Sequence, residues 1–205
     1  MRSSGVLRRA HPVVRQHRPG PVGRLEMITL CCTQKLLRRL RIARPEAASV
    51  VPTNALGNWY ANLIHVGRVR MVMATSERTL LTVLLPAVDL RKSLLPNLCE
   101  AVYLLLQQLG VDQARAASEV DAMREVRIGR TENRSVLGSM NDLSQMLDWD
   151  VRDGRPPMEI MLRLAHTPMT GVVVKEGSHG FPDDATRKLF GIEKKRRFVG
   201  TSPAT

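Results

Sequence analysis

The sequence predicts an α+β domain in which a small, mainly antiparallel sheet is covered by amphipathic helices. Three strand-like segments follow one another between residues 56 and 85, and a long apolar helical pattern comes directly after them. With 205 residues, 43% of them hydrophobic, the chain is long enough to bury one core. We therefore expect a single domain of two layers, a sheet and its helices.

The three strand-like segments predict an antiparallel meander. Turn residues at Gly67 and at Ser76-Glu77 separate them, and Val69, Met71 and Met73 alternate with more polar neighbours. The expected strands are residues 58–64, 68–74 and 79–85. Since residues 80–85 form a nearly continuous apolar run, we expect this strand to be the buried centre of the sheet.

Helices and two further strands are expected around the meander. Residues 27–40 indicate a short strand that runs into an amphipathic helix, with Leu36, Leu37 and Leu40 on one side. Its other side is basic, which fits either contact with phosphate or a solvated surface; its members are Lys35, Arg38, Arg39 and Arg41. Later segments predict helices at 94–109, 112–123, 133–149 and 158–165, and a strand at 125–131 with Val126 and Ile128 facing inward.

The charge of the chain, formally +12, is concentrated toward its two ends. Residues 1–26 are rich in arginine, proline and glycine and are expected to be disordered, either as an untranslated upstream reading or as a basic arm. Residues 27–170 are the expected domain, and residues 171–205 a basic, weakly ordered tail. A nucleic-acid partner is one interpretation of this charge, although basic tails do not require a folded basic groove.

The remaining composition excludes several classes of protein. The apolar runs fall short of the roughly 20 residues that a membrane-spanning helix needs, and no secretory signal precedes the domain, so a cytoplasmic location is expected. Cys31, Cys32 and Cys99 do not form a disulfide framework. The five histidines are scattered, so we predict no metal site, and no motif indicates a cofactor.

Two stretches supply candidate site residues. On the helix expected from residue 133, core residues gather on one face, and the opposite face carries Arg134, Gly138, Asn141, Asp142 and Gln145. The candidate binding residues of this helix are Arg134, Ser135, Asn141 and Asp142. This face is either a functional surface or ordinary solvated helix.

The second stretch is a strand that carries Trp59, Tyr60 and Asn62 in a chain with only 3% aromatic residues. One aromatic ring is expected to anchor the core and the other to meet a second layer or a partner, such as a nucleic-acid base. Core packing with a satisfied amide is the alternative interpretation.

Together with a third motif, these stretches resemble a known family. The motifs are Trp-Tyr-Ala-Asn at residues 59–62, Ser-Glu-Arg-Thr-Leu-Leu at residues 76–81 and Arg-Ser-Val-Leu-Gly-Ser-Met-Asn-Asp at residues 134–142. They resemble an uncharacterised family of bacterial proteins, a domain of unknown function, over about residues 27–149. The resemblance implies no reaction or ligand, and it adds Glu77, Arg78 and Thr79 to the residues to test.

The sequence leaves three functions open. No phosphate-binding loop, dinucleotide-binding motif, zinc-protease motif or nucleophile elbow is present. An interaction module that binds nucleic acid is the first hypothesis. The second is an enzyme of unknown reaction, with a site between the Asn62 strand and the Arg134–Asp142 helix, where Glu77 and Asp142 are the candidate acids. The third is a protein-protein regulatory partner, which an exposed apolar patch would support.

Overall fold

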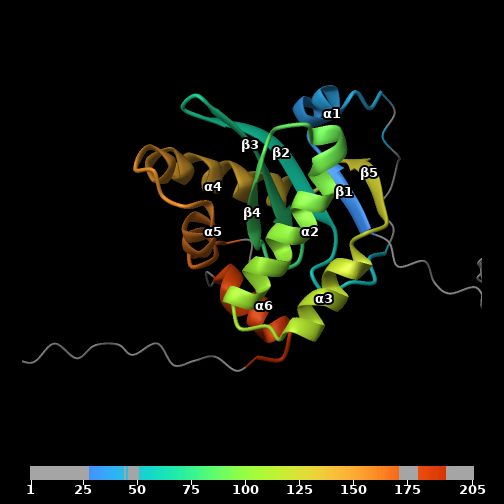
Figure 1. Cartoon of the computed structure of the whole chain (residues 1–205), viewed down its shortest axis with the longest axis vertical. Helices are drawn as coiled ribbons and strands as arrows, with labels where there is room; N and C mark the ends of the chain where they lie inside the picture. The colour runs from blue at the N-terminus through green and yellow to red at the C-terminus, as the bar shows by residue number, and fades with distance from the viewer. Residues whose placement is uncertain (1–27, 44, 46–50, 171–179, 193–205) are drawn as a thin grey trace, which may run out of the picture.

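A computed structural model describes residues 28–43, 45, 51–170 and 180–192, and Figure 1 presents the whole chain. In the described residues one five-stranded sheet has α2 in front of it and α4 behind it (Figure 1). The strands are β1 (Ile28–Cys32), β2 (Trp59–Val66), β3 (Val69–Ser76), β4 (Thr82–Pro86) and β5 (Val126–Arg130). The helices are α1 (Gln34–Leu40), α2 (Leu90–Gln108), α3 (Gln113–Ala122), α4 (Arg134–Arg152), α5 (Pro157–Ala165) and α6 (Pro182–Leu189).

The sheet has the strand order β4-β3-β2-β1-β5 and confirms the α+β class. Strands β2, β3 and β4 form the antiparallel meander that the turns predicted. Strand β1 instead runs parallel to both β2 and β5, because α1 and the segment after it return the chain to the same end of the sheet. The sheet is therefore antiparallel on one side of β2 and parallel on the other.

The expected position of one strand was wrong. β4 is an edge strand of the sheet rather than its centre, and β2 takes the central place. Residues 82–85 are nevertheless buried, because α2 packs on β4 from one side and α5 contacts it from another. The apolar run therefore predicted burial correctly. Burial on both faces, however, does not distinguish a central strand from an edge strand that helices cover.

The helices start and end close to their predicted positions, with identifiable caps. The Asp112 carboxylate accepts a hydrogen bond from the Arg115 amide (3.0 Å) at the start of α3, as its sequence position suggested. The Asn133 side chain accepts from the amides of Ser135 (3.0 Å) and Val136 (3.3 Å) at the start of α4. A side chain therefore satisfies one first-turn amide of α3 and two of α4.

The C-terminal part contains more structure than the sequence suggested. A weakly ordered segment was expected from residue 171, yet α6 lies within it and packs against α5. Arg187 donates to the Leu109 carbonyl oxygen (3.1 Å), and the Phe190 ring is buried. The expectation for residues 1–26 lies outside the described residues.

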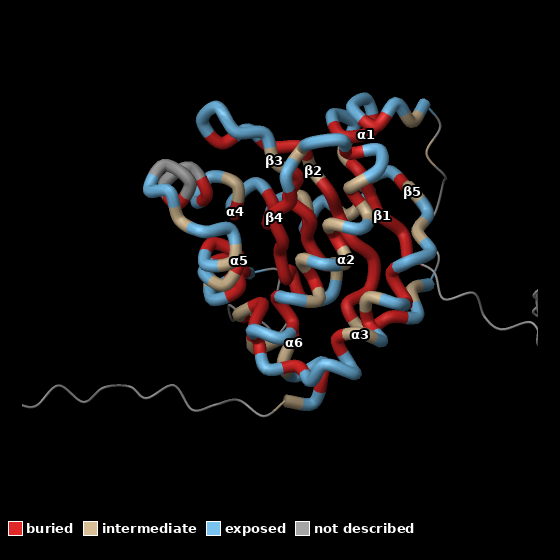
Figure 2. Tube along the Cα trace, in the orientation of Figure 1, coloured by how far each residue is buried: buried red, intermediate tan, exposed pale blue. Residues whose placement is uncertain are grey.

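Most of the buried positions lie on the strands and on the helix faces turned toward them, as Figure 2 shows. In the described part of the chain, no helix is both long enough and apolar enough to cross a membrane.

Candidate functional site

Some of the predicted site residues meet at the end of the sheet where β2 begins. The Glu77 carboxylate accepts hydrogen bonds from the Asn58 amide group (3.2 Å) and from the Tyr60 hydroxyl (3.4 Å). Further along β2, the Thr33 hydroxyl donates to the Asn62 side-chain oxygen at 2.9 Å. Glu77 is therefore bonded to residues at the start of β2, and Asn62 to the residue that follows β1.

The two aromatic residues do not offer a surface for stacking. Trp59 is 0% exposed and Tyr60 is 4% exposed, so neither ring can reach a base on the outside of the domain. Burial, followed by the charges of Cys31 and Glu77, raises the pKa of the Tyr60 hydroxyl well above its usual range. The expectation that one ring meets a nucleic-acid partner is therefore not met by the arrangement of β2.

The turn after β3 holds a neighbouring loop in place. Thr79 donates to the Ser76 hydroxyl (3.2 Å), and Ser76 donates to the Leu56 carbonyl oxygen (2.8 Å). Arg78 crosses Gly57 to donate to the Ala55 carbonyl oxygen at 3.1 Å. Gly57 has φ +77°, and a Cβ there would lie 3.0 Å from the Arg78 side chain, so both the backbone and the space favour glycine.

The polar face of α4 lies on the surface, as predicted. The candidate binding residues of this helix are exposed; they are Arg134, Ser135, Asn141 and Asp142. Within the described residues, no hydrogen bond or ion pair joins any of them to Glu77. The paired-acid site hypothesised for Glu77 and Asp142 therefore has no contact that supports it.

The cysteines have the properties of core residues. Burial raises the pKa of the Cys31 thiol to about 11 and that of Cys32 to about 12. Both thiols are protonated at neutral pH and are poor nucleophiles. Among the described residues, no group of three or more His, Cys, Asp or Glu side chains could hold a metal ion.

A concentrated positive charge occupies one end of the domain. It lies on α1, on the hairpin between β2 and β3, and on the first turn of α2, which Figure 1 shows together at the upper end. We call this surface the basic end. Its members are all exposed: Lys35, Arg38, Arg39, Arg41, Arg68, Arg70, Arg91 and Lys92.

Local packing explains why these cations face outward. The leucines of α1 are buried against the sheet, so the intervening basic residues of that helix point to solvent. Contacts join the three segments: Lys35 Nζ lies 3.0 Å from His65 Nδ1, and the Ala87 amide donates to the Arg70 carbonyl oxygen at 3.3 Å. The basic end is therefore a continuous part of the fold.

Acidic groups scarcely neutralise this surface. Asp89 is the only acid within residues 34–43, 65–70 and 87–92. No carboxylate in the described part of the chain forms an ion pair with a cation of the basic end. Eight exposed cations without acidic partners produce a strong local positive potential that attracts anions.

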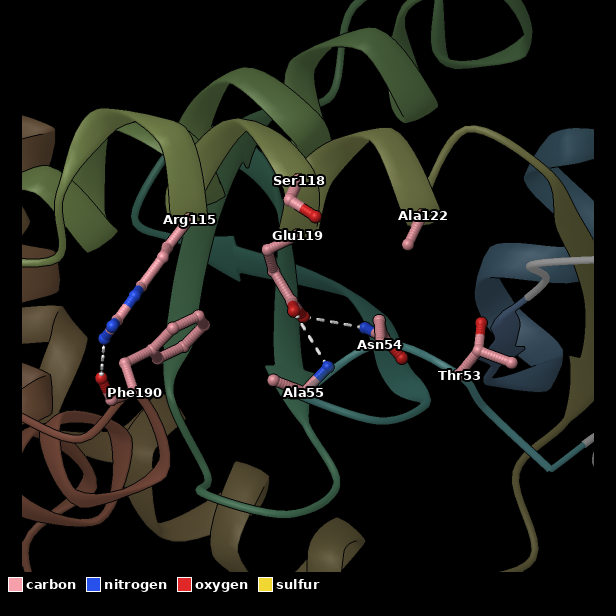
Figure 3. A pocket seen from close by; sticks show the side chains of 8 residues that line it. All are labelled: Thr53, Asn54, Ala55, Arg115, Ser118, Glu119, Ala122 and Phe190. Carbon is pink, nitrogen blue, oxygen red and sulfur yellow. Dashed lines mark hydrogen bonds between the residues drawn. The ribbon is translucent and has the colours of Figure 1, made fainter.

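A second polar cluster has a structural role. It lies in the loop before β2, at the end of this strand opposite the basic end. The Glu119 carboxylate of α3 accepts from the Asn54 side chain (2.8 Å) and from the amides of Ala55 (2.8 Å) and Leu56 (2.9 Å). Figure 3 shows this clamp beside a hollow of about 270 Å³, with Arg115 reaching the Phe190 carbonyl oxygen on its far side. Since three donors already satisfy the carboxylate, its evident role is to fix the loop before β2.

Sequence reasoning did not identify the basic end or the Glu119 clamp. The basic face of α1 was visible as an amphipathic pattern, but the partners that extend it, Arg68 and Arg91, come from distant segments. The sequence around Glu119 is that of an ordinary solvated helix surface, whereas in the fold this residue is only 5% exposed. Only the burial pattern of the folded chain distinguishes it from its exposed neighbour Asp121.

Comparison with known proteins gives one match. Residues 29–185 match the family model described as "Domain of unknown function (DUF6933)". The matched range spans the positions of all three motifs on which the sequence resemblance rests. No curated protein and no solved structure matches the chain significantly.

Proposed function

We propose that this chain, which belongs to the DUF6933 family of domains of unknown function, binds nucleic acid through the basic end. The observation that carries the proposal is the gathering of eight exposed cations without acidic partners on one end of the described domain. A line of phosphates is the polyanion that such a spread of charges fits, since each neutralised phosphate releases counterions and so contributes affinity.

The contacts we expect are to the backbone of the nucleic acid. The basic end has arginines and lysines but no exposed aromatic ring within its segments, residues 34–43, 65–70 and 87–92. Contacts to phosphates position a protein on the polymer without reading its sequence. Binding is therefore expected to depend weakly on base sequence and strongly on salt. A cytoplasmic location is proposed with it, and the three free cysteines, two of them buried, support that.

The test uses the full chain and a triple variant, Arg38→Ala with Arg39→Ala and Arg68→Ala. Binding to labelled single-stranded and duplex oligonucleotides is measured by fluorescence anisotropy at several salt concentrations. The slope of log K against log salt should become shallower by about 0.7–0.9 for each contact with phosphate that is lost. Three lost contacts would weaken binding at low salt by at least about tenfold.

A matched control removes three exposed cations from other surfaces: Arg124→Ala with Arg134→Ala and Lys188→Ala. Both variants lose the same charge and keep both termini of the chain, so the basic residues outside the domain contribute equally to each. An equal loss of affinity in the two variants would assign binding to overall charge. Unchanged binding in the variant of the basic end would rule the proposal out.

A further inference from the structure

A cleft opens inside the basic end, between α1, the first turns of α2, and the β1–β5 side of the sheet. Its volume is about 380 Å³. Buried leucines form its floor, and half-exposed apolar side chains line its walls; the latter are Ile42, Leu95, Val126 and Ile128. The rim carries three exposed cations, Arg41, Arg91 and Lys92.

The cleft combines apolar walls with a rim of cations. Apolar walls favour a ligand that leaves water, whereas the guanidinium and ammonium groups at the rim favour an anion. Nothing acidic on the rim offsets this charge except Asp89, and the first turn of α2 contains no acid. One molecule satisfies both properties only if it carries a negative group at one end of an apolar body.

The backbone at the mouth of the cleft is held in unusual conformations. Arg41 has φ 60° and Asp89 has φ 45°, both in the left-handed region that residues other than glycine rarely adopt. Arg41 closes α1 and Asp89 precedes α2, so each strained residue fixes one side of the opening. Such conformations persist where the surroundings hold them, and they occur at functional sites as well as at helix ends.

We propose that this cleft binds an organic anion with an apolar body, such as a medium-chain fatty acid. The carboxylate lies at the rim near Arg41, Arg91 and Lys92, and the acyl chain lies against Leu95 and Ile128. A nucleobase fits less well, because its polar edges would face apolar walls without hydrogen-bond partners. The apolar half of the site has no counterpart in contacts to phosphate, so its binding can be tested apart from nucleic-acid binding even though the two sites share the rim cations.

Isothermal titration calorimetry of the full chain with three probes separates the two properties. Octanoate carries both the charge and the apolar body, acetate carries the charge alone, and octanol carries the body alone. Octanoate should bind at least about tenfold more tightly than acetate or octanol, because each of these two probes lacks one of the two favourable interactions. Equal affinity for octanoate and octanol would refute the role of the cations.

Two kinds of variant place the binding in the cleft. Arg91→Ala with Lys92→Ala should weaken octanoate about tenfold and leave octanol unchanged. Leu95→Trp fills the cavity and should abolish binding of octanoate; Ile42→Phe does the same from the α1 side if the tryptophan variant does not fold.

Leu104→Trp, at an exposed apolar position elsewhere on α2, is the matched control and should bind octanoate normally. Octanoate that binds both cavity-filling variants with wild-type affinity would overturn the proposal. The cavity-filling variants keep the cations of the basic end. Measuring their affinity for oligonucleotides therefore distinguishes a failure of the cleft proposal from a failure of the proposed function.

Discussion

Replacement of Arg41 by glycine should make the domain more stable and at the same time weaken its binding of anions. Arg41 ends α1 with φ 60° and ψ 38°, and its amide donates to the Arg38 carbonyl oxygen at 3.2 Å. The next amide, of Ile42, donates to the Leu37 carbonyl oxygen at 3.1 Å. This hydrogen-bond pattern is the Schellman closure of a helix, in which glycine usually occupies the left-handed position.

The size of the effect follows from two opposing costs. A residue with a Cβ pays about 1–2 kcal/mol in the left-handed region, and glycine avoids that cost. Glycine loses about 0.5–1 kcal/mol more conformational entropy on folding, which offsets part of the gain. Arg41→Gly should therefore raise the free energy of unfolding by about 0.5–1 kcal/mol, which corresponds to a rise in Tm of about 1–4 °C for a chain of this size.

Urea denaturation measures the stability, and anisotropy at several salt concentrations measures binding of the same preparations to an oligonucleotide. Loss of the Arg41 guanidinium should reduce the salt slope by about 0.7–0.9. Arg38→Gly is the matched control: it loses the same cation from the helical part of α1 and should destabilise by about 1 kcal/mol. An Arg41→Gly variant that is less stable than the parent would refute the strain argument.

Two further predictions concern buried groups. Glu119→Ala removes the acceptor of three hydrogen bonds and should lower the free energy of unfolding by about 3 kcal/mol or more. Glu100→Ala, on the exposed face of α2, is the control and should change this free energy by less than about 0.5 kcal/mol. Urea denaturation measures both. Stability should also fall as the pH rises from about 9 to 11, because burial raises the pKa of Cys31 from 9.0 to about 11 and the unfolded chain releases this proton first. Denaturation of Cys31→Ala over the same pH range should give a shallower decrease, and an identical slope would contradict the assignment.

Local patterns in the sequence were sufficient to predict most of the elements. The period of α2, the cap at Asp112 and the turns at Gly67 and Ser76 each depend on residues close together in the chain, and each appears where expected. The order of the strands depends instead on which surfaces pack after collapse. Nothing within residues 80–85 indicates that α5, more than 70 residues later, covers them at the edge of the sheet.

The candidate site was less predictable for the same physical reason. Residues 59–62 had the right types for a binding strand, but strand β2 became the centre of the sheet, where both faces are covered. The cations of the basic end come from three separate segments, and no one of these segments indicates by itself that the cations lie together in the fold. The Glu119 clamp satisfies backbone amides more than 60 residues away, and its partners could not be inferred without the fold.

The two proposals make one joint prediction, because Arg41, Arg91 and Lys92 belong both to the basic end and to the rim of the cleft. A carboxylate bound at the rim neutralises one charge there and occupies donors that a phosphate would use, so the two ligands should oppose each other's binding. Coupling between binding sites is reciprocal, and the factor by which octanoate weakens oligonucleotide binding must equal the factor in the opposite direction. With one contact shared, saturating octanoate should raise the Kd for an oligonucleotide by about twofold or more in anisotropy at low salt. Leu95→Trp, which closes the cleft without removing a cation, should bind the oligonucleotide with normal affinity. Octanoate should not change the Kd of this variant for the oligonucleotide. If octanoate binds the parent chain yet leaves this Kd unchanged, the phosphates do not contact the rim, and the nucleic-acid surface is confined to α1 and the β2–β3 hairpin.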